Sequence, residues 1–207
     1  MKLYYSRGAC SQAPHIILHE TGVPHDSVSV DLKAKRLEDG SDYLTINPKG
    51  AVPALELDNG EVLTENAVIL QYIAELAGNE QLLPPPGDLQ RYRVLEWLNF
   101  IASELHKGFG PLFNPTSSDE AKQAARDTIG KKFDYVEKQL GDRPYLMGAQ
   151  FSLPDAYLFV ILGWAGKMSI DLARWHNLAD YRARLAERES VRDVLEFEGL
   201  IEPATAV

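Results

Sequence analysis

Cys10 is the only cysteine of the 207-residue chain, and its position predicts a reactive thiol. Pro14 lies four residues further on, and a helix tolerates proline only in its first turn, where the backbone N–H has no partner within the helix. We therefore expect the first helix to begin between Cys10 and Ala13, after a loop that contains Gly8. Free N–H groups and the positive end of the helix dipole stabilise a thiolate there, whether it belongs to Cys10 or to a bound thiol.

Two alternatives to a nucleophilic Cys10 stay open. A lone cysteine is often only a small buried hydrophobe, and the hydroxyl groups of Tyr5 and Ser11 could assist or replace the thiol. Arg7 and Ala13 occupy the positions that would complete a Cys-x-x-Cys pair, so dithiol chemistry has no resolving thiol here.

The segment from Asn47 to Leu55 predicts a loop that enters a strand at Pro53. A proline at such a position marks either the start of an edge strand or a cis peptide bond. A cis Val52–Pro53 bond would turn the backbone N–H and C=O of Val52 outward, where they could pair with an extended peptide as an added strand. The trans form is the commoner one, so the residues alone leave both geometries open.

The next helix start predicts a second binding position, for an anion. Thr64 is a good N-cap, and the amides that follow it open a helix with an apolar stripe. Such a helix end favours a carboxylate. Glu65 is either an ordinary first-turn acid or a partner for an ammonium group beside that carboxylate.

A polar stripe is predicted in the second half of the chain, where Asn99, Ser103 and His106 are spaced i, i+4 and i+7. A stripe of this kind can be functional or simply solvated, and the residues do not decide between the two. Glu104 falls on the apolar side of the same helix, which is unusual for an acid that has no partner.

A metal site is not expected. His15 and His19 are spaced i, i+4 and could share an ion, but the sequence offers no Glu at a catalytic spacing and no clear third ligand.

Three consecutive prolines at positions 84–86 predict a domain boundary, because proline removes a backbone donor and fixes φ. Upstream, β-rich runs alternate with helical patterns, which predicts an α/β layer, and Asp58-Asn59-Gly60 predicts an antiparallel hairpin. We expect a mixed four-stranded sheet, with strands near residues 3–5, 27–30, 54–57 and 61–63.

Downstream, helix-period patterns near residues 89–108, 119–140, 153–167 and 178–197 predict a helical bundle. Ser152 and Asp155 predict a capping box, whose role is in folding. The expected fold class is thus α/β plus all-α. The expected domains are residues 1–81, a proline-rich linker at 82–88, and an all-helical domain at 89–207.

The composition of the chain argues against nucleic acid and membranes as partners. Hydrophobic residues make up 45% and charged residues 25%, as in ordinary globular proteins. The net charge of -9 argues against a nucleic-acid partner, because such binding depends on Lys and Arg. The single cysteine, the lack of a signal-peptide pattern and the lack of any apolar run of about 20 residues predict a cytoplasmic protein that does not enter a membrane.

Taken together, these motifs resemble the bacterial beta-class glutathione transferases over essentially the whole chain. The resemblance rests on Tyr5, Gly8-Ala9-Cys10-Ser11, the segment 47–55, Leu63-Thr64-Glu65-Asn66, Glu96-Trp97-Leu98-Asn99, the segment 104–109 and the segment 151–159. It implies a thioredoxin-like domain followed by an all-helical domain, a homodimer, and detoxification chemistry with glutathione as co-substrate.

In that family the matching positions bind glutathione. The resemblance puts Cys10 at the glutathione sulfur, Lys35 near the glycyl end, Val52 beside the peptide backbone before a cis Pro53, and Glu65 with Asn66 at the γ-glutamyl end. It also implies that His106 and Lys107 face Cys10 across a domain cleft and act with it in catalysis. Asn99, Ser103, Glu104 and His106 complete the expected glutathione-binding set, and Asn99 and Glu104 would reach the glutathione of a partner subunit.

The predicted function is therefore a glutathione transferase that promotes attack of glutathione on a small hydrophobic electrophile, thiol-disulfide exchange through Cys10, or both. We expect the electrophile between Phe109, Phe113 and Trp164. Two alternatives are a non-catalytic interaction module with the same fold, and a glutathione-dependent dehalogenase or isomerase.

Overall fold

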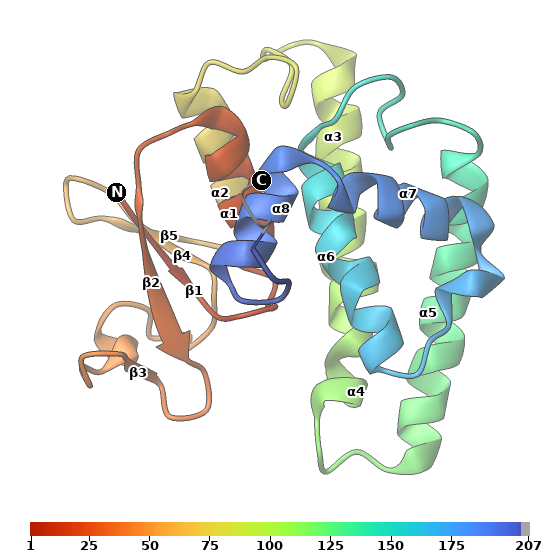
Figure 1. Ribbon diagram of the computed structural model, residues 1–207, viewed down its shortest axis with the longest axis horizontal. Coiled ribbons are helices and arrows are strands. Elements are labelled where there is room, and N and C mark those ends of the chain that lie inside the picture. Colours follow the sequence, from red (N-terminus) through yellow and green to blue (C-terminus); the bar gives the residue numbers. More distant parts are fainter. Residues whose placement is uncertain (204–207) are drawn as a thin grey trace. The chain divides into compact units, whose positions relative to one another are not determined.

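The computed structural model describes residues 1–203, which form two compact units. One unit holds residues 1–80 together with 186–203, and the other holds residues 81–185. The sequence analysis placed the whole of 89–207 in the helical domain, whereas the described end of the chain groups with the N-terminal unit. The reason is that helix α8 (Glu189–Phe197) packs against helix α1 (Gln12–Thr21), as Figure 1 shows. Residues 204–207 lie outside the described part.

The N-terminal unit is built on a mixed sheet with the strand order β3-β2-β1-β4-β5. Strand β1 pairs in parallel with β2, and β4 forms the predicted antiparallel hairpin with β5. Within residues 1–203 this sheet has five strands, so the prediction of four is wrong. The extra strand has only two residues, too few to show a period of two in the sequence. The strands are β1 (Lys2–Tyr5), β2 (Asp26–Asp31), β3 (Arg36–Leu37), β4 (Ala54–Glu56) and β5 (Val62–Thr64).

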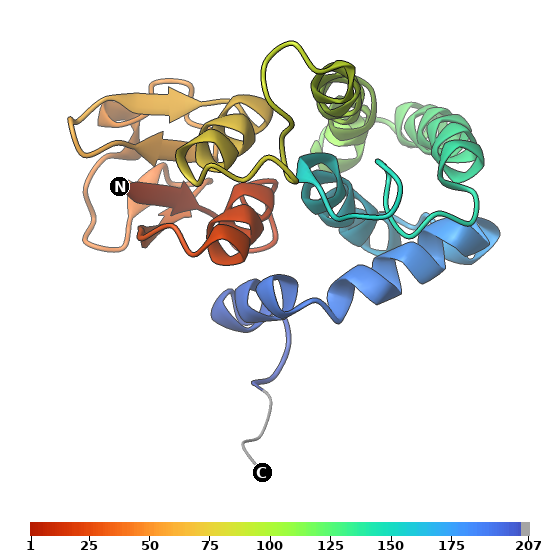
Figure 2. The ribbon, with the colours of Figure 1, turned by 90° about the horizontal axis from the view of Figure 1, so that it is seen from above.

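Both faces of this sheet are covered. Alternate side chains of a strand point to opposite faces, and Tyr4 and Ala54 pack in a cluster with Tyr43, which belongs to the 3-10 helix η1 (Tyr43–Thr45). Leu3 and Leu55 face the other way and are fully buried. Helices α1 and α2 (Asn66–Leu76) lie side by side over that second face (Figure 2).

Both helices begin close to where the sequence placed them. Helix α1 starts at Gln12, within the predicted interval, and Ser11 is its N-cap. Helix α2 starts at Asn66 with Glu65 as its N-cap, so the prediction of Thr64 as N-cap is wrong. Thr64 is instead the last residue of β5 and pairs with Ala54, because the hairpin extends one residue further than its apolar pattern indicates.

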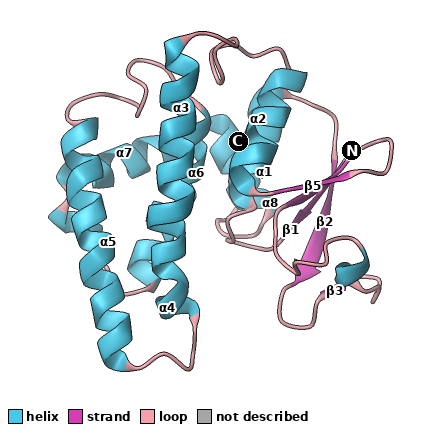
Figure 3. Ribbon diagram, turned by 180° about the vertical axis from the view of Figure 1, so that it is seen from behind, coloured by secondary structure: helices cyan, strands magenta, loops and turns pink. Residues whose placement is uncertain are grey.

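The second unit consists of helices joined by loops (Figure 3). The predicted first helix is not uniform: α3 ends at Phe100 and continues as a π-helical segment, Ile101–His106, and a 3-10 turn, Lys107–Phe109. The predicted helix over 178–197 is two helices, α7 and α8, which are separated at residues 187–188. The α-helices of this unit are α3 (Leu89–Phe100), α4 (Gly110–Phe113), α5 (Asp119–Leu140), α6 (Leu153–Lys167) and α7 (His176–Ala186).

Helix α6 is the centre of this unit and is buried along most of its length. The predicted capping box at its start is present, and the Asp155 carboxylate is fully buried. It accepts hydrogen bonds from the Leu146 amide at 2.8 Å, from Tyr181 Oη at 2.7 Å, and from both the amide and the hydroxyl of Ser152. Burial raises the pKa of Asp155, and these donors oppose that shift. Asp155 thus joins three segments of the unit, in keeping with the predicted role in folding.

None of the helices within residues 1–203 combines the length and apolar character that a membrane crossing requires.

Candidate functional site

Cys10 and Val52 meet in the N-terminal unit, although 42 positions separate them. Cys10 lies in the turn just before α1 and is 8% exposed, and its Sγ donates a hydrogen bond to the Val52 carbonyl at 3.1 Å. The start of α1 favours a thiolate at this position, whereas the Val52 carbonyl accepts from the protonated thiol. The contact therefore brings the predicted thiol end of the site onto the predicted peptide-binding loop.

The loop that carries Val52 is firmly held. The Val52–Pro53 peptide bond is cis, as the family resemblance implied. The carbonyl of Ala51 accepts hydrogen bonds from Tyr43 Oη at 2.8 Å and from Asn47 Nδ2 at 2.7 Å. Both Val52 and Pro53 are buried.

Asn66, at the start of α2, is hydrogen-bonded to the backbone of Cys10. Its Nδ2 donates to the Cys10 carbonyl at 2.8 Å, and the residue is 6% exposed. Its Oδ1 is buried and, among residues 1–203, finds no hydrogen-bond partner. A buried acceptor of this kind is costly unless something binds it. Asn66 thus positions Cys10 through the backbone.

Glu65 and Lys35 each contact the cis-proline loop, the segment 47–55, through a lysine ammonium group. Glu65 has a φ of +74° and an exposed carboxylate, whose Oε1 is 2.7 Å from Lys49 Nζ. Lys35 has a φ of +56°, and its Nζ donates to the Gly50 carbonyl at 2.6 Å. The sequence reasoning missed Lys49; its position beside Gly50 in the proline loop was the available signal.

His106, from the second unit, is held against helix α6. Its Nδ1 lies 2.7 Å from Tyr157 Oη, and its ring centre lies 5.0 Å from that of Trp164. Asn99 and Ser103 are exposed, whereas His106 is half-buried, so the three residues do not form one solvated stripe. The cause is the π-helical segment, which has more residues per turn than an α-helix and turns His106 toward α6.

Glu104 is not the unpartnered acid that the helical wheel indicated. Its carboxylate contacts the ammonium group of Lys132, from helix α5, and is partly exposed. Lys107, the residue after His106, is exposed.

The three aromatic residues predicted to surround an electrophile do gather in this unit. The Trp164 ring centre lies 5.5 Å from that of Phe109 and 5.0 Å from that of Phe113. His106 contacts the same indole, so this aromatic cluster continues directly to the imidazole.

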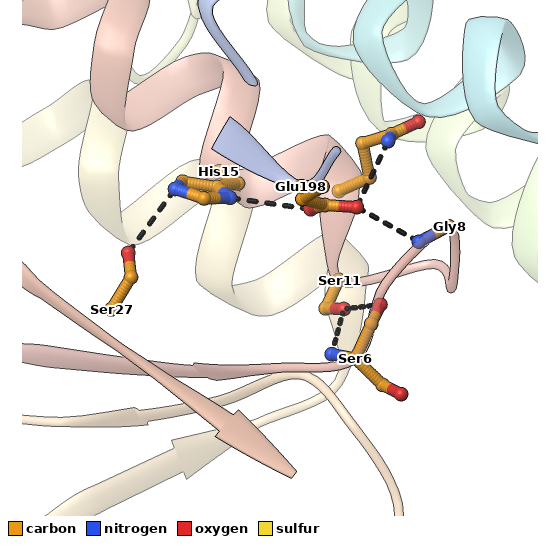
Figure 4. A network of polar contacts seen from close by, with 7 residues as sticks. Ser6, Gly8, Ser11, His15, Ser27 and Glu198 are labelled. Atoms are coloured by element: carbon orange, nitrogen blue, oxygen red, sulfur yellow. Dashed lines mark hydrogen bonds and ion pairs between the residues drawn. The ribbon is translucent and has the colours of Figure 1, made fainter. Parts of the chain in front are cut away.

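A buried acid that the sequence reasoning did not select supports the Cys10 turn. Glu198, just after α8, is 5% exposed and accepts hydrogen bonds from the Gly8 amide at 2.8 Å and from Gln12 Nε2 at 3.1 Å (Figure 4). Its other oxygen lies 3.3 Å from His15 Nδ1. No local pattern could have found Glu198, because its partners lie more than 180 residues away.

The hydroxyl alternatives to Cys10 are engaged elsewhere. Ser11 Oγ accepts from the Ser6 amide at 3.1 Å and so holds the turn (Figure 4). Tyr5 packs against His15 and Phe197, and burial together with the nearby Glu198 raises the pKa of its phenol. Tyr5 thus remains protonated, and Ser11 Oγ is occupied within the turn.

The fold and this site define a class: a thioredoxin-like sheet, with a cis-proline loop against a cysteine at the start of the first helix, joined to an all-helical domain. The family model for the N-terminal domain of glutathione S-transferase matches residues 8–76, and that for the C-terminal domain matches residues 100–189. The chain belongs to the glutathione S-transferase family.

Individual relatives agree with this assignment. Glutathione S-transferase GstA of Escherichia coli O157:H7 is 48% identical over 200 residues, covering 97% of this chain and 100% of that protein. A beta-class glutathione S-transferase structure from Sphingomonas chungbukensis matches with a TM-score of 0.94 at 50% identity, over 97% of this chain and 100% of that one. A sphingomonad enzyme complexed with glutathione matches with a TM-score of 0.93 at 48% identity, over the same shares. The predicted resemblance to the bacterial beta class is thereby confirmed.

Proposed function

We propose that this chain is a glutathione transferase whose glutathione thiol lies beside Cys10. The observation that carries the proposal is the 3.1 Å contact between Cys10 Sγ and the Val52 carbonyl, with Asn66 bound to the Cys10 backbone. A cysteine thiol, the cis-proline loop and the start of α2 thus lie together within one unit. The relatives named above, one of them in complex with glutathione, support the same ligand.

The tripeptide fits this group in one direction. Its γ-glutamyl carboxylate is suited to the amides at the start of α2, and its ammonium group to the exposed carboxylate of Glu65. The central peptide pairs with Val52 as an added strand. Lys35 is the cation for the glycyl carboxylate, and the thiol is then left at Cys10.

Two reactions are open to this arrangement. In conjugation, the glutathione thiolate attacks an electrophilic carbon, a carbon–sulfur bond forms, and the leaving group departs with its electron pair. In exchange, the Cys10 thiolate attacks the glutathione sulfur of a mixed disulfide between glutathione and a second thiol, and forms a Cys10–glutathione disulfide with release of the second thiolate. A second glutathione then attacks, releases oxidised glutathione and restores Cys10. Neither route requires a metal ion.

The helical unit supplies the remaining proposed parts. We assign the electrophile to the cluster of Phe109, Phe113 and Trp164. His106 and Lys107 are the cationic or hydrogen-bonding groups that favour the thiolate, and Asn99, Ser103 and Glu104 are the further glutathione contacts. We assign glutathione binding to the predicted domain of residues 1–81.

We also propose a homodimer. The support is a cavity of about 580 Å³ between α3 and α5, whose lining includes Trp97, Phe100 and Tyr135. Aromatic rings that line an open cavity on a helical face are typical of subunit interfaces. Sedimentation should give a dimer for the wild type and a monomer for Trp97→Glu. The single cysteine, which forms no internal disulfide, favours action in the reducing cytoplasm.

The test is mass spectrometry of the protein after incubation with oxidised glutathione. We expect a glutathione-sized adduct on Cys10 in the wild type and none in Cys10→Ala. We expect the Cys10→Ala variant still to bind a glutathione column, because the carboxylate and peptide contacts remain. A wild-type protein that gains no adduct, does not bind the column and conjugates no electrophile would exclude this function and favour the interaction module.

A further inference from the structure

A cluster of three histidines lies in the N-terminal unit, apart from the proposed glutathione site. His15 and His19 stand one turn apart on α1, and His25 comes from the loop before β2. One ring nitrogen of each can be chosen so that all three lie within 4.8 Å of one another. His25 is a third possible ligand, which the sequence spacing of His15 and His19 did not predict. We infer that His15, His19 and His25 form a binding site for one divalent transition-metal ion of the zinc type.

The acceptors beside the three rings are of the kind found around metal-binding imidazoles. Such a ring usually donates one N–H to a carboxylate or backbone carbonyl and ligates through its other nitrogen. His25 Nδ1 lies 2.9 Å from the Val23 carbonyl, and His15 Nδ1 lies 3.3 Å from Glu198 Oε1. His19 Nδ1 lies 3.6 Å from Asp193 Oδ2. In all three rings Nδ1 faces an acceptor, which leaves Nε2 for the ion.

His15 is the fixed member of the cluster. Its side chain is fully buried, with Glu198 on one side and Ser27 on the other (Figure 4). Its Nε2 lies 3.1 Å from the Ser27 hydroxyl, and this is the one contact that an ion would replace. A hydroxyl rotates freely about its Cβ–Oγ bond, so Ser27 can turn away or toward a metal-bound water.

The three histidine nitrogens would have to move only slightly closer together to bind one ion. A tetrahedral ion with Zn–N bonds of 2.0–2.1 Å holds its nitrogen ligands about 3.4 Å apart. The greatest separation in the cluster, 4.8 Å, exceeds this by about 1.4 Å. His19 and His25 are only half-buried, so rotation of their side chains can supply the closure.

Two acidic residues and a cavity lie beside the histidine cluster. The acceptors Glu198 and Asp193 are acidic and offset the charge of a bound cation. A cavity of about 490 Å³, lined by His19, Glu20 and Asp193 together with residues 188–190, reaches one member of the cluster, His19. Water is then available as the fourth ligand.

A bound ion would have a structural effect. His15 and His19 belong to α1, and His25 directly precedes β2. Of the two acids, Asp193 lies on α8 and Glu198 follows it. One ion would therefore join three segments of the N-terminal unit. Its link to the Cys10 turn runs through His15 and Glu198, which accepts from the Gly8 amide, so we expect the ion to alter stability more than chemistry.

The test is a titration of the full chain, free of any affinity tag, treated with a chelator and kept free of glutathione. Cobalt is the probe, because cobalt in a site with three imidazoles absorbs visible light. We expect one cobalt ion per chain in the wild type and at least a tenfold weaker affinity in His19→Gln and in His25→Gln. His176→Gln, which changes an exposed histidine of the other unit, should bind like the wild type. Cys10→Ala should do the same, which separates the cluster from the thiol.

Thermal unfolding gives a second readout. Zinc at a free concentration of about 100 times its Kd should raise the wild-type midpoint by about 5 °C or more, but leave His25→Gln unchanged. A wild type that binds no cobalt would overturn the assignment. Binding that survives unchanged in both cluster variants, or that is lost in Cys10→Ala alone, would overturn it as well.

Discussion

The side-chain amide of Asn66 donates a 2.8 Å hydrogen bond to the backbone carbonyl of Cys10, across 56 positions of the chain. The bond joins the start of α2 to the turn before α1, and it is buried. It therefore fixes the backbone of the thiol residue independently of the contact between the thiol and Val52.

Changing Asn66 to Asp should destabilise the protein by about 2 kcal/mol. A carboxylate cannot donate to the Cys10 carbonyl, and the substitution brings two buried acceptors together. Urea unfolding measures the loss. The control is Asn59→Asp in the exposed hairpin turn, where Asn59 Oδ1 accepts from the Glu61 amide and an aspartate oxygen can do the same. We expect that control within about 0.5 kcal/mol of the wild type, and equal effects of the two changes would contradict the proposed role of Asn66.

The ion pair between Glu65 and Lys49 gives a matched test of the proposed ammonium site. Glu65→Gln should weaken glutathione binding at least tenfold, about 1.4 kcal/mol, because it removes the charge that holds the γ-glutamyl ammonium. Lys49→Gln should change the affinity less than threefold, since both side chains of the pair are exposed and such pairs contribute little. Titration calorimetry with glutathione measures both. Equal losses in the two variants would indicate that the pair acts by shaping the loop, and not through the Glu65 charge.

Glu198→Gln should loosen the Cys10 turn and the contact between α1 and α8. The two carboxylate oxygens face the Gly8 amide, Gln12 Nε2 and His15 Nδ1, and the NH₂ of glutamine would oppose at least one of these groups. We expect a loss of about 1–3 kcal/mol and faster hydrogen exchange in α1 and α8. Glu202→Gln, at an exposed position four residues later, should leave both measurements unchanged. Unaltered exchange in Glu198→Gln would refute the supporting role of this acid.

Asp155→Ala should destabilise the helical unit strongly. Its four hydrogen bonds involve donors from three segments, and the alanine leaves those donors buried without an acceptor. We expect a loss of about 3 kcal/mol or more, which corresponds to a fall of roughly 6–12 °C in the unfolding midpoint for a chain of this size. Differential scanning calorimetry measures it, with Asp180→Ala on the exposed side of α7 as the control. A midpoint within 2 °C of the wild type, by the same roughly 2–4 °C per kcal/mol, would rule out a folding role for Asp155.

Local chemistry explains the parts of the fold that sequence reasoning predicted well. Pro14 restricted the start of α1, Asn59 and Gly60 indicated the hairpin, and Ser152 with Asp155 indicated the capping box. Each of these depends on neighbours within about four residues, and the structure confirms all three. The two-residue strand β3, the π-helical segment and the break between α7 and α8 escaped prediction, because tertiary packing decides them and no residue in them has a strong local preference.

By itself, the sequence determined where the thiol lies along the chain, which helix N-terminus it precedes and which family the chain resembles. The tertiary structure alone decided that Cys10 meets the Val52 carbonyl, that Asn66 and Glu198 support its turn, that Lys132 partners Glu104 and that His25 joins His15 and His19. These contacts join residues up to 190 positions apart. Such contacts depend on how the sheet and helices close around the core, and residue spacing along the chain carries no direct record of that closure.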